Sequence, residues 1–300
     1  MDIFECESID YHIGKKLYVR PVHQFDVSQL GTRHRMSYIY SGHANMNVPS
    51  NYWGLWQRTL LTMSDCLDTS SQAYWLQTSS WHADIRIPAN RPDFTGVMTL
   101  ADCSGEQLSW LAKQQGFVGI TAVTGNQCEW KRAIDFQPPS GKRDIGRMLF
   151  EYPDKLLEYG IEDVYSEIWE RKTDDKNERC YALQLLDQGE PAEPASYLLV
   201  SSNHFIYLRN RLARLAQQAF KSSDQLQHYP QDELVQLLDF EISFGLILGA
   251  GNPWKIILST LPWREGQALY EKEPVFTPVK GVCQDLCSRK TWRVLCWNPE

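Results

Sequence analysis

The sequence predicts a mainly β protein, an antiparallel meander closed into a barrel, with capping helices and a smaller C-terminal α+β portion. Residues 80–87 alternate between apolar and polar side chains, which is the period of a half-buried strand. The same alternation recurs along the following stretch of the chain, with turn residues between the runs. The chain also carries 11 Trp and 14 Tyr, side chains that suit sheets and barrel interiors.

Two segments precede the predicted sheet. Residues 1–52 are expected to form an irregular N-terminal extension, because Pro21 and Gly31 interrupt any continuous helix. Residues 53–63 (WGLWQRTLLTM) place apolar side chains three and four positions apart, which predicts an amphipathic helix. This helix would cover one end or one face of the barrel.

The barrel itself is expected within residues 53–208. Gly, Pro and Asn separate the strands at short intervals without a helix pattern between them, which predicts hairpins rather than βαβ units. Closure would remove the edge strands that a long meander leaves exposed. The predicted strands are 73–78, 80–87, 95–101, 107–112, 117–124, 127–136, 144–150, 155–160, 163–171, 179–186, 195–201 and 203–208.

Residues 209–300 are expected to hold a helix pair and additional strands. Apolar spacings of three and four predict one helix over 208–220, and Pro230 is well placed to open a second one that ends near Leu238. The later strands could complete the barrel or build a second, smaller sheet, and periodicity does not decide between these alternatives. These later strands are predicted at 240–249, 254–260 and 290–297.

Charge and hydropathy narrow the class of protein. A formal net charge of −7 argues against a dedicated nucleic-acid-binding protein, so no nucleic-acid partner is expected. The N-terminus MDIFECESID is acidic where a signal peptide would be basic and then apolar, and the apolar run at 244–250 is too short to span a bilayer. We therefore expect a cytoplasmic protein with no membrane span. The sequence does not define an oligomeric state.

The eight Cys residues are interpreted as reduced thiols, because the sequence shows no export signal. Cys283, Cys287 and Cys296, spaced C-x3-C-x8-C, could hold zinc with a fourth ligand, but this spacing matches no common zinc knuckle. We interpret them as buried or half-buried thiols and predict no metal site. The sequence also lacks the G-x-S-x-G, G-x-x-x-x-G-K-[ST] and H-E-x-x-H motifs, and no cofactor is expected.

Three predicted strands, 80–87, 127–136 and 163–171, combine apolar and charged side chains. Outward-facing charges would form cross-strand salt bridges on a solvated sheet and need no function. Inward-facing charges would have to pair with one another or meet polar groups of a ligand, because an unpaired buried charge is strongly unfavourable. Both alternatives stay open at the level of sequence.

Arg132 is the sharpest candidate for a ligand-binding residue. It shares a predicted strand face with Trp130, Ile134 and Phe136, which puts an arginine on an apolar face. An arginine among aromatic side chains could hold the carboxylate of a largely apolar ligand through paired hydrogen bonds. The predicted ligand-binding residues are Arg132, Arg171, Trp130, Trp169 and Tyr165.

His82, Asp84 and Glu167 are the candidates for acid/base catalysis. Asp84 shares a strand face with His82 and could orient its ring only through side-chain reach or through a neighbouring strand. A lone His is more often structural than catalytic, so catalysis stands here as an alternative to binding.

Four strings of the sequence carry a family resemblance: WLQT at 75–78, DIRIP at 84–88, EIWER at 167–171 and STLPWR at 259–264. On these strings, residues 53–270 resemble a poorly characterised family of microbial proteins with a lipocalin-like, or calycin, β-barrel. The resemblance implies a ligand-binding barrel and supplies no established reaction.

The first hypothesis is a cytoplasmic binding protein that holds a hydrophobic small molecule, which could be anionic, in the barrel cavity. One alternative is an isomerase, cyclase or lyase that uses acid/base residues in the same cavity. The other alternative is a protein-interaction module whose core is filled by its own side chains, so that no small molecule binds.

Overall fold

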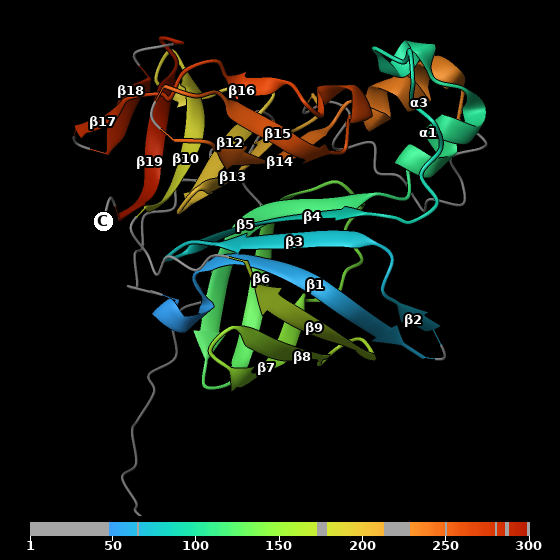
Figure 1. Ribbon diagram of the computed structural model, residues 1–300, viewed down its shortest axis with the longest axis vertical. Helices are drawn as coiled ribbons and strands as arrows, with labels where there is room; N and C mark the ends of the chain where they lie inside the picture. Colours follow the sequence, from blue (N-terminus) through green and yellow to red (C-terminus); the bar gives the residue numbers. More distant parts are fainter. Residues whose placement is uncertain are drawn as a thin grey trace, which may run out of the picture. The chain divides into compact units, whose positions relative to one another are not determined.

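The computed structural model describes residues 48–64, 66–172, 179–212, 229–249, 251–279, 281–285 and 288–298. These residues build a mainly β protein, as the sequence predicts, and their strands form two antiparallel sheets (Figure 1). Both sheets belong to one compact unit, Ala44–Glu300. Most of the predicted N-terminal extension, residues 1–47, lies outside the described residues.

The first sheet closes into an eight-stranded antiparallel barrel among the described residues, because β9 pairs back onto β1. A short strand, β2 (Cys66–Asp68), extends the barrel at the end of β1. The barrel strands are β1 (Gly54–Met63), β3 (Gln72–Gln77), β4 (Trp81–Ile87), β5 (Gln115–Thr124), β6 (Gln127–Asp135), β7 (Ile145–Tyr152), β8 (Lys155–Gly160) and β9 (Tyr165–Arg171).

The later strands build a second sheet rather than complete the barrel, which resolves the alternative that periodicity leaves open. This second sheet has the order β16-β15-β14-β13-β12-β10-β19-β18-β17, with β11 beside β10. It also contains the strands near 179–186, 195–201 and 203–208 that the sequence analysis places in the barrel. Its strands are β10 (Cys180–Asp187), β11 (Glu190–Pro191), β12 (Ser196–Ser201), β13 (His204–Arg209), β14 (Glu241–Ile247), β15 (Trp254–Ser259), β16 (Ala268–Tyr270), β17 (Phe276–Val279), β18 (Val282–Asp285) and β19 (Thr291–Asn298).

The predicted helix at 53–63 is wrong, because this segment is strand β1. The physical reason is a β-bulge: the register between β1 and β9 shifts between Arg58 and Leu60. A bulge inserts one extra residue and reverses the inward and outward alternation beyond it. In β1 the bulge leaves Arg58 and Leu61 three positions apart on the same face, and Leu60 falls on the other face. Apolar residues from both faces therefore imitate helical spacing.

The predicted strands at 95–101 and 107–112 are also wrong. The first is loop followed by the 3-10 turn η2 (Leu100–Asp102), and the second belongs to helix α1 (Gly105–Leu111). Ser104 caps this helix: its hydroxyl accepts the backbone N–H of Gln107, whose side chain accepts the Ser104 N–H in return. This reciprocal capping box is the sequence signal for a helix start.

The second predicted helix of the C-terminal portion is confirmed as α3 (Gln231–Leu238), with Pro230 immediately before it. The first predicted helix begins too early, since Leu208 lies in strand β13. The remainder of that helix, beyond Leu212, lies outside the described residues.

The main apolar core lies between the outer wall of the barrel and the second sheet. Ile85 on β4 is fully buried there, as are Leu199 on β12 and Ile206 on β13. Ring contacts cross the same boundary, with centroids 4.5 Å apart for Tyr74 and Phe244. The outward side of β4 is therefore apolar because it faces another sheet, and the polar side of the same strand points into the barrel.

Candidate functional site

Strand β4 shows which way the charges point. Ala83 and Ile85 face the second sheet, whereas His82, Asp84 and Arg86 point into the barrel. Asp84 is 2 % exposed and His82 is fully buried. The sequence leaves open whether the charged side chains face outward or inward, and on β4 they face inward.

Four tryptophans fill the middle of the barrel. Trp75 is the hub, with ring centroids 5.6 Å from Trp130, 5.9 Å from Trp169 and 6.1 Å from Trp56. Together with Phe117, these rings occupy the space that a hydrophobic ligand would need. Trp130 and Trp169, predicted to bind a ligand, pack against the protein's own side chains.

One end of the barrel is closed by the segment before β1. The Tyr52 ring packs edge-on against Phe150 with centroids 4.9 Å apart, and Arg171 lies 4.1 Å above the Trp56 ring. The Arg171 guanidinium also donates to the backbone carbonyls of Trp53 and Asn51. Arg171 therefore fixes the entering chain. Each of its three guanidinium nitrogens already donates to an oxygen of the protein, with Asp154 accepting from Nε at 3.2 Å.

An ionic layer lies towards the other end of the barrel. Glu167 Oε1 accepts from Arg58 Nη1 at 2.6 Å and from Arg86 Nη1 at 3.2 Å. Arg86 also grips Asp84 with two nearly parallel bonds, Nε to Oδ1 at 2.9 Å and Nη2 to Oδ2 at 3.2 Å. Burial raises the pKa of Asp84, and the adjacent Arg86 charge opposes that rise. These charges are paired with one another, as buried charges must be.

Glu158 on β8 lies beside this layer and has a different set of partners. It accepts a hydrogen bond from the Tyr165 hydroxyl at 2.7 Å and one from the Trp169 indole N–H at 3.0 Å. Burial, and then the nearby Glu167 charge, raise the pKa of Glu158 to about 8. The predicted ligand donor Tyr165 therefore directs its hydroxyl to a carboxyl of the protein.

His82 and Asp84 do not form a catalytic pair. The His82 Nδ1 lies 2.9 Å from Thr121 Oγ1, and Thr121 donates in turn to Gln77 Oε1 at 2.8 Å. Burial and the Arg132 charge lower the pKa of His82 to about 3, so the ring is neutral near pH 7. Asp84 bonds to Arg86 instead, and the two predicted partners enter separate networks.

Arg132 does not share a face with Phe136, contrary to the strict alternation of the sequence. The register between β5 and β6 shifts so that Gly119 pairs with Arg132 and Val118 with Ile134, which leaves Ala133 as an extra residue. Phe136 consequently turns outward into the core against the second sheet.

The Arg132 side chain remains on the barrel side, 3.7 Å above the Phe117 ring. It donates to Asp135 at 2.6 Å and to Asp144 at 2.6 Å, and a third of it is exposed. The charge is thus shared between two acids at the rim of the barrel.

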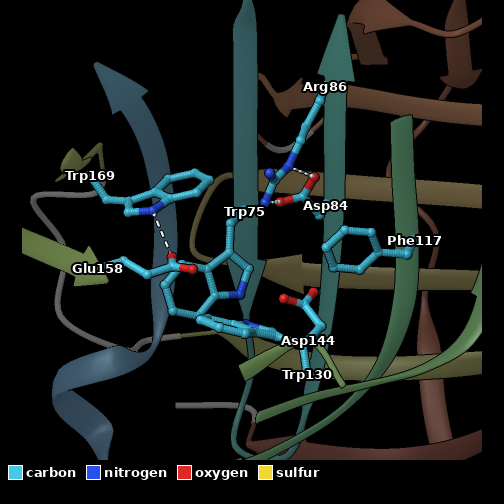
Figure 2. Close-up of a pocket in the computed structure, with 8 residues that line it drawn as sticks. All are labelled: Trp75, Asp84, Arg86, Phe117, Trp130, Asp144, Glu158 and Trp169. Atoms are coloured by element: carbon cyan, nitrogen blue, oxygen red, sulfur yellow. Dashed lines mark hydrogen bonds and ion pairs between the residues drawn. The ribbon is translucent and has the colours of Figure 1, made fainter. Parts of the chain in front are cut away.

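The centre of the barrel keeps a cavity of only about 10 Å³, the space of about one water molecule. Figure 2 shows the aromatic rings and the carboxyl groups that converge on it. Its lining residues are Trp75, Asp84, Arg86, Phe117, Trp130, Asp144, Glu158 and Trp169.

A larger pocket of about 240 Å³ lies at the barrel mouth above the ionic layer, and we call it the mouth pocket. Arg86 lines both spaces, so the ionic layer separates the mouth pocket from the central cavity. Its lining residues are Arg58, Leu61, Met63, Asp68, Ser71, Arg86, Ile87, Pro88, Lys113, Gln115, Tyr165 and Glu167.

Tyr165 and Glu167 are identified from the sequence, whereas Arg58, Lys113 and Glu158 are not. Arg58 was hidden because its segment imitates a helix. The signal for Glu158 was present, since it alternates with Leu157 and Tyr159 in a strand that could have been tested for inward polar residues.

The C-terminal cysteines do not form a metal centre within the part of the chain that is described. Cys283 is buried on β18, Cys296 is half-buried on β19, and Cys287 lies outside the described residues. No group of three His, Cys, Asp or Glu side chains has metal-binding geometry among the described residues. The described helices include none long and apolar enough to cross a membrane.

Fold and site together define a β-barrel protein whose interior is ionic and aromatic and whose accessible pocket lies at the mouth. The structure is similar to the crystal structure of the uncharacterized protein YLR301w from Saccharomyces cerevisiae, with a TM-score of 0.50 and 12% identity. The match covers 81% of this chain and 98% of that one, and at this identity it shows a common fold alone. No family model matches the sequence, and no curated protein matches it.

Proposed function

We propose that this protein binds a small amphipathic anion in the mouth pocket. The observation that carries the proposal is a pocket of about 240 Å³ with an ionic floor and an apolar wall. Small-molecule sites are concave and largely apolar, with a few placed polar groups. The lipocalin-like relationship and the cytoplasmic location inferred from the sequence are consistent with this role and remain part of the proposal.

The ligand's apolar part would lie against the aliphatic lining residues. These residues are Leu61, Met63, Ile87 and Pro88. A wholly apolar molecule inside the barrel is disfavoured, because the central cavity holds about 10 Å³. The proposed ligand is therefore smaller than the one expected from the sequence, and its proposed site is the mouth of the barrel instead of the interior.

The anionic group would be held by Lys113. Its side chain is exposed at the mouth pocket and makes no ion pair with a described residue. Arg58 and Arg86 are already committed to Glu167 and Asp84. They add positive potential to the floor while each already pairs with an acidic side chain of the protein.

The test is isothermal titration calorimetry of the full chain with octanoate and with its uncharged analogue octanamide. We expect octanoate to bind more tightly, Lys113→Gln to remove that preference, and Leu61→Trp to abolish binding of both by filling the pocket. Leu149→Trp on the outer barrel wall and Lys255→Gln on β15 are the matched controls, since both positions are exposed and away from the pocket. Equal binding by Leu61→Trp and the unmodified protein would refute the site.

A protein-interaction module is the second candidate, and the filled barrel centre is the observation that favours it. It predicts no heat with either ligand and no effect of Leu61→Trp. The catalytic alternative depends on Glu167, the one of its three candidates that lines the mouth pocket. It would require turnover that is lost in Glu167→Gln while octanoate still binds.

A further inference from the structure

We propose that the barrel interior contains a proton-binding site, in which the Glu158 carboxyl is protonated and its O–H donates a hydrogen bond to Glu167 Oε2. The two residues are direct cross-strand neighbours on β8 and β9, and both side chains point into the barrel. Glu158 is 3 % exposed and Glu167 is 1 % exposed. Opposed carboxyl groups this deeply buried cannot both be ionised at low cost.

The distribution of cations identifies which carboxyl is neutral. Among the described residues, the other carboxylates that reach the barrel interior each form a salt bridge with an arginine, whereas Glu158 forms none. A buried carboxylate without a salt bridge favours its protonated form. The matched pairs are Asp84 with Arg86, Asp144 with Arg132, and Glu167 with Arg58.

The hydrogen bonds of Glu167 indicate which atom accepts the Glu158 O–H. Glu167 Oε1 accepts from two arginines, but Glu167 Oε2 is buried and has no donor among the described side chains and backbone. A buried acceptor without a donor is unfavourable. The acid proton of Glu158, from the directly opposed position, supplies that donor and satisfies both requirements at once.

The neighbouring strand leaves room for this arrangement. A Cβ added at Gly146 on β7 would stand 2.9 Å from Glu158 Cγ and 3.1 Å from its Oε1. Glycine at this position therefore makes space for the carboxyl. The titratable and charged groups that act on Glu158, or on which it acts, are Glu167 and Tyr165 on β9, Arg86 on β4, Asp144 before β7 and Cys128 on β6.

This site goes beyond the proposed binding function and does not depend on it. Glu167 and Tyr165 also line the mouth pocket, so the proton lies directly beneath the place where a ligand would bind. A group at the mouth that competes for Glu167 or Tyr165 would change the affinity for this proton.

The experiment is infrared spectroscopy of the ligand-free full chain, which resolves the C=O stretch of a protonated carboxylic acid from carboxylate bands. We expect one acid band at neutral pH that is absent in Glu158→Gln and unchanged in Glu170→Gln. Glu170 is the matched control, since it lies on β9 beside Lys172 and its side chain is 47% exposed. In Glu167→Gln the band should vanish at neutral pH, because the freed arginines would favour ionised Glu158. A spectrum of the unmodified protein with no band that depends on Glu158 overturns the proposal.

Thermal unfolding as a function of pH gives a second readout, which does not depend on assigning an infrared band. The Glu158 pKa is raised from 4.5 to about 8 in the folded chain, so the folded state holds more protons than the unfolded state between those values. The stability contributed by Glu158 is therefore present at low pH and lost as pH rises through that window. Glu158→Gln, a neutral isostere, should flatten this decline in Tm, and an unchanged decline would count against the site.

Discussion

The barrel and the second sheet are both antiparallel and similar in strand number, yet they differ in the side chains that they bury. Inside the barrel, arginines, carboxylates and tryptophans pack around a water-sized space. The second sheet is packed on aliphatic and aromatic side chains such as Leu198, Val200 and Phe205. The outer face of the barrel is apolar at β3 and β4 because the second sheet covers it there. Which face of a strand is the core is thus decided by its neighbours and not by the strand itself.

Removing the central carboxylate of the ionic layer should lower the free energy of unfolding more than any other substitution described below. Glu167→Ala leaves Arg58 buried without its closest partner, and we expect a loss of about 4 kcal/mol in the free energy of unfolding. Denaturant unfolding at neutral pH measures it. Glu170→Ala on the same strand should change the value by no more than about 0.5 kcal/mol. A Glu167 variant as stable as this control would mean that the ionic layer does not hold the barrel together.

Truncation at the boundary between the sheets tests the apolar side of the comparison. Ile85→Ala removes a fully buried side chain from the wall of β4, and we expect a loss of about 3 kcal/mol from transfer and cavity terms. Ile257→Ala on β15, where the side chain is 44% exposed, is the matched control and should cost about 1 kcal/mol or less. Equal losses at the two positions would show that the second sheet does not bury the barrel wall in solution.

The closed end of the barrel should respond less. Arg171→Ala removes the stacking on Trp56 and the bonds to the carbonyls of Trp53 and Asn51, with an expected loss of about 2 kcal/mol. Arg171→Lys should lose nearly as much, since an ammonium cannot reproduce the planar set of donors. Chemical denaturation of both variants measures the difference. If Arg171→Lys were as stable as the unmodified protein, the positive charge of Arg171 would matter and its planar set of donors would not.

The sequence is sufficient for the fold class and for strands such as β3, β4 and β8, where alternation and turn residues agree. It fails at β1 and at the end of β6, because a single bulged residue in each strand breaks the period on which the inference depends. That one residue converts β1 into an apparent helix and puts Phe136 on the wrong side of the wall. Bulges are set by pairing with another strand, and one strand read alone does not contain that information.

The candidate site, too, can be predicted from the sequence only in part. The sequence identifies Glu167 and Tyr165 as chemically unusual, but it does not show which face of their strand, β9, points into the barrel. Lys113 follows a helix that was predicted as a strand, so its place at the mouth pocket was not accessible to inference. The sequence therefore reveals part of the chemistry but not the mouth pocket.

Arg132 gives the smallest expected effect and the sharpest test of where a ligand binds. Its side chain is one-third exposed and shared between Asp135 and Asp144, so Arg132→Ala should cost only about 1 kcal/mol of stability. It does not line the mouth pocket, and octanoate affinity measured by calorimetry should stay the same. A clear loss of affinity in Arg132→Ala, with the fold intact, would return the binding site to the face that the sequence alone predicts. It would also mean that the aromatic centre opens in solution, because nothing larger than a water molecule fits beside Phe117 and Trp130 as they are packed.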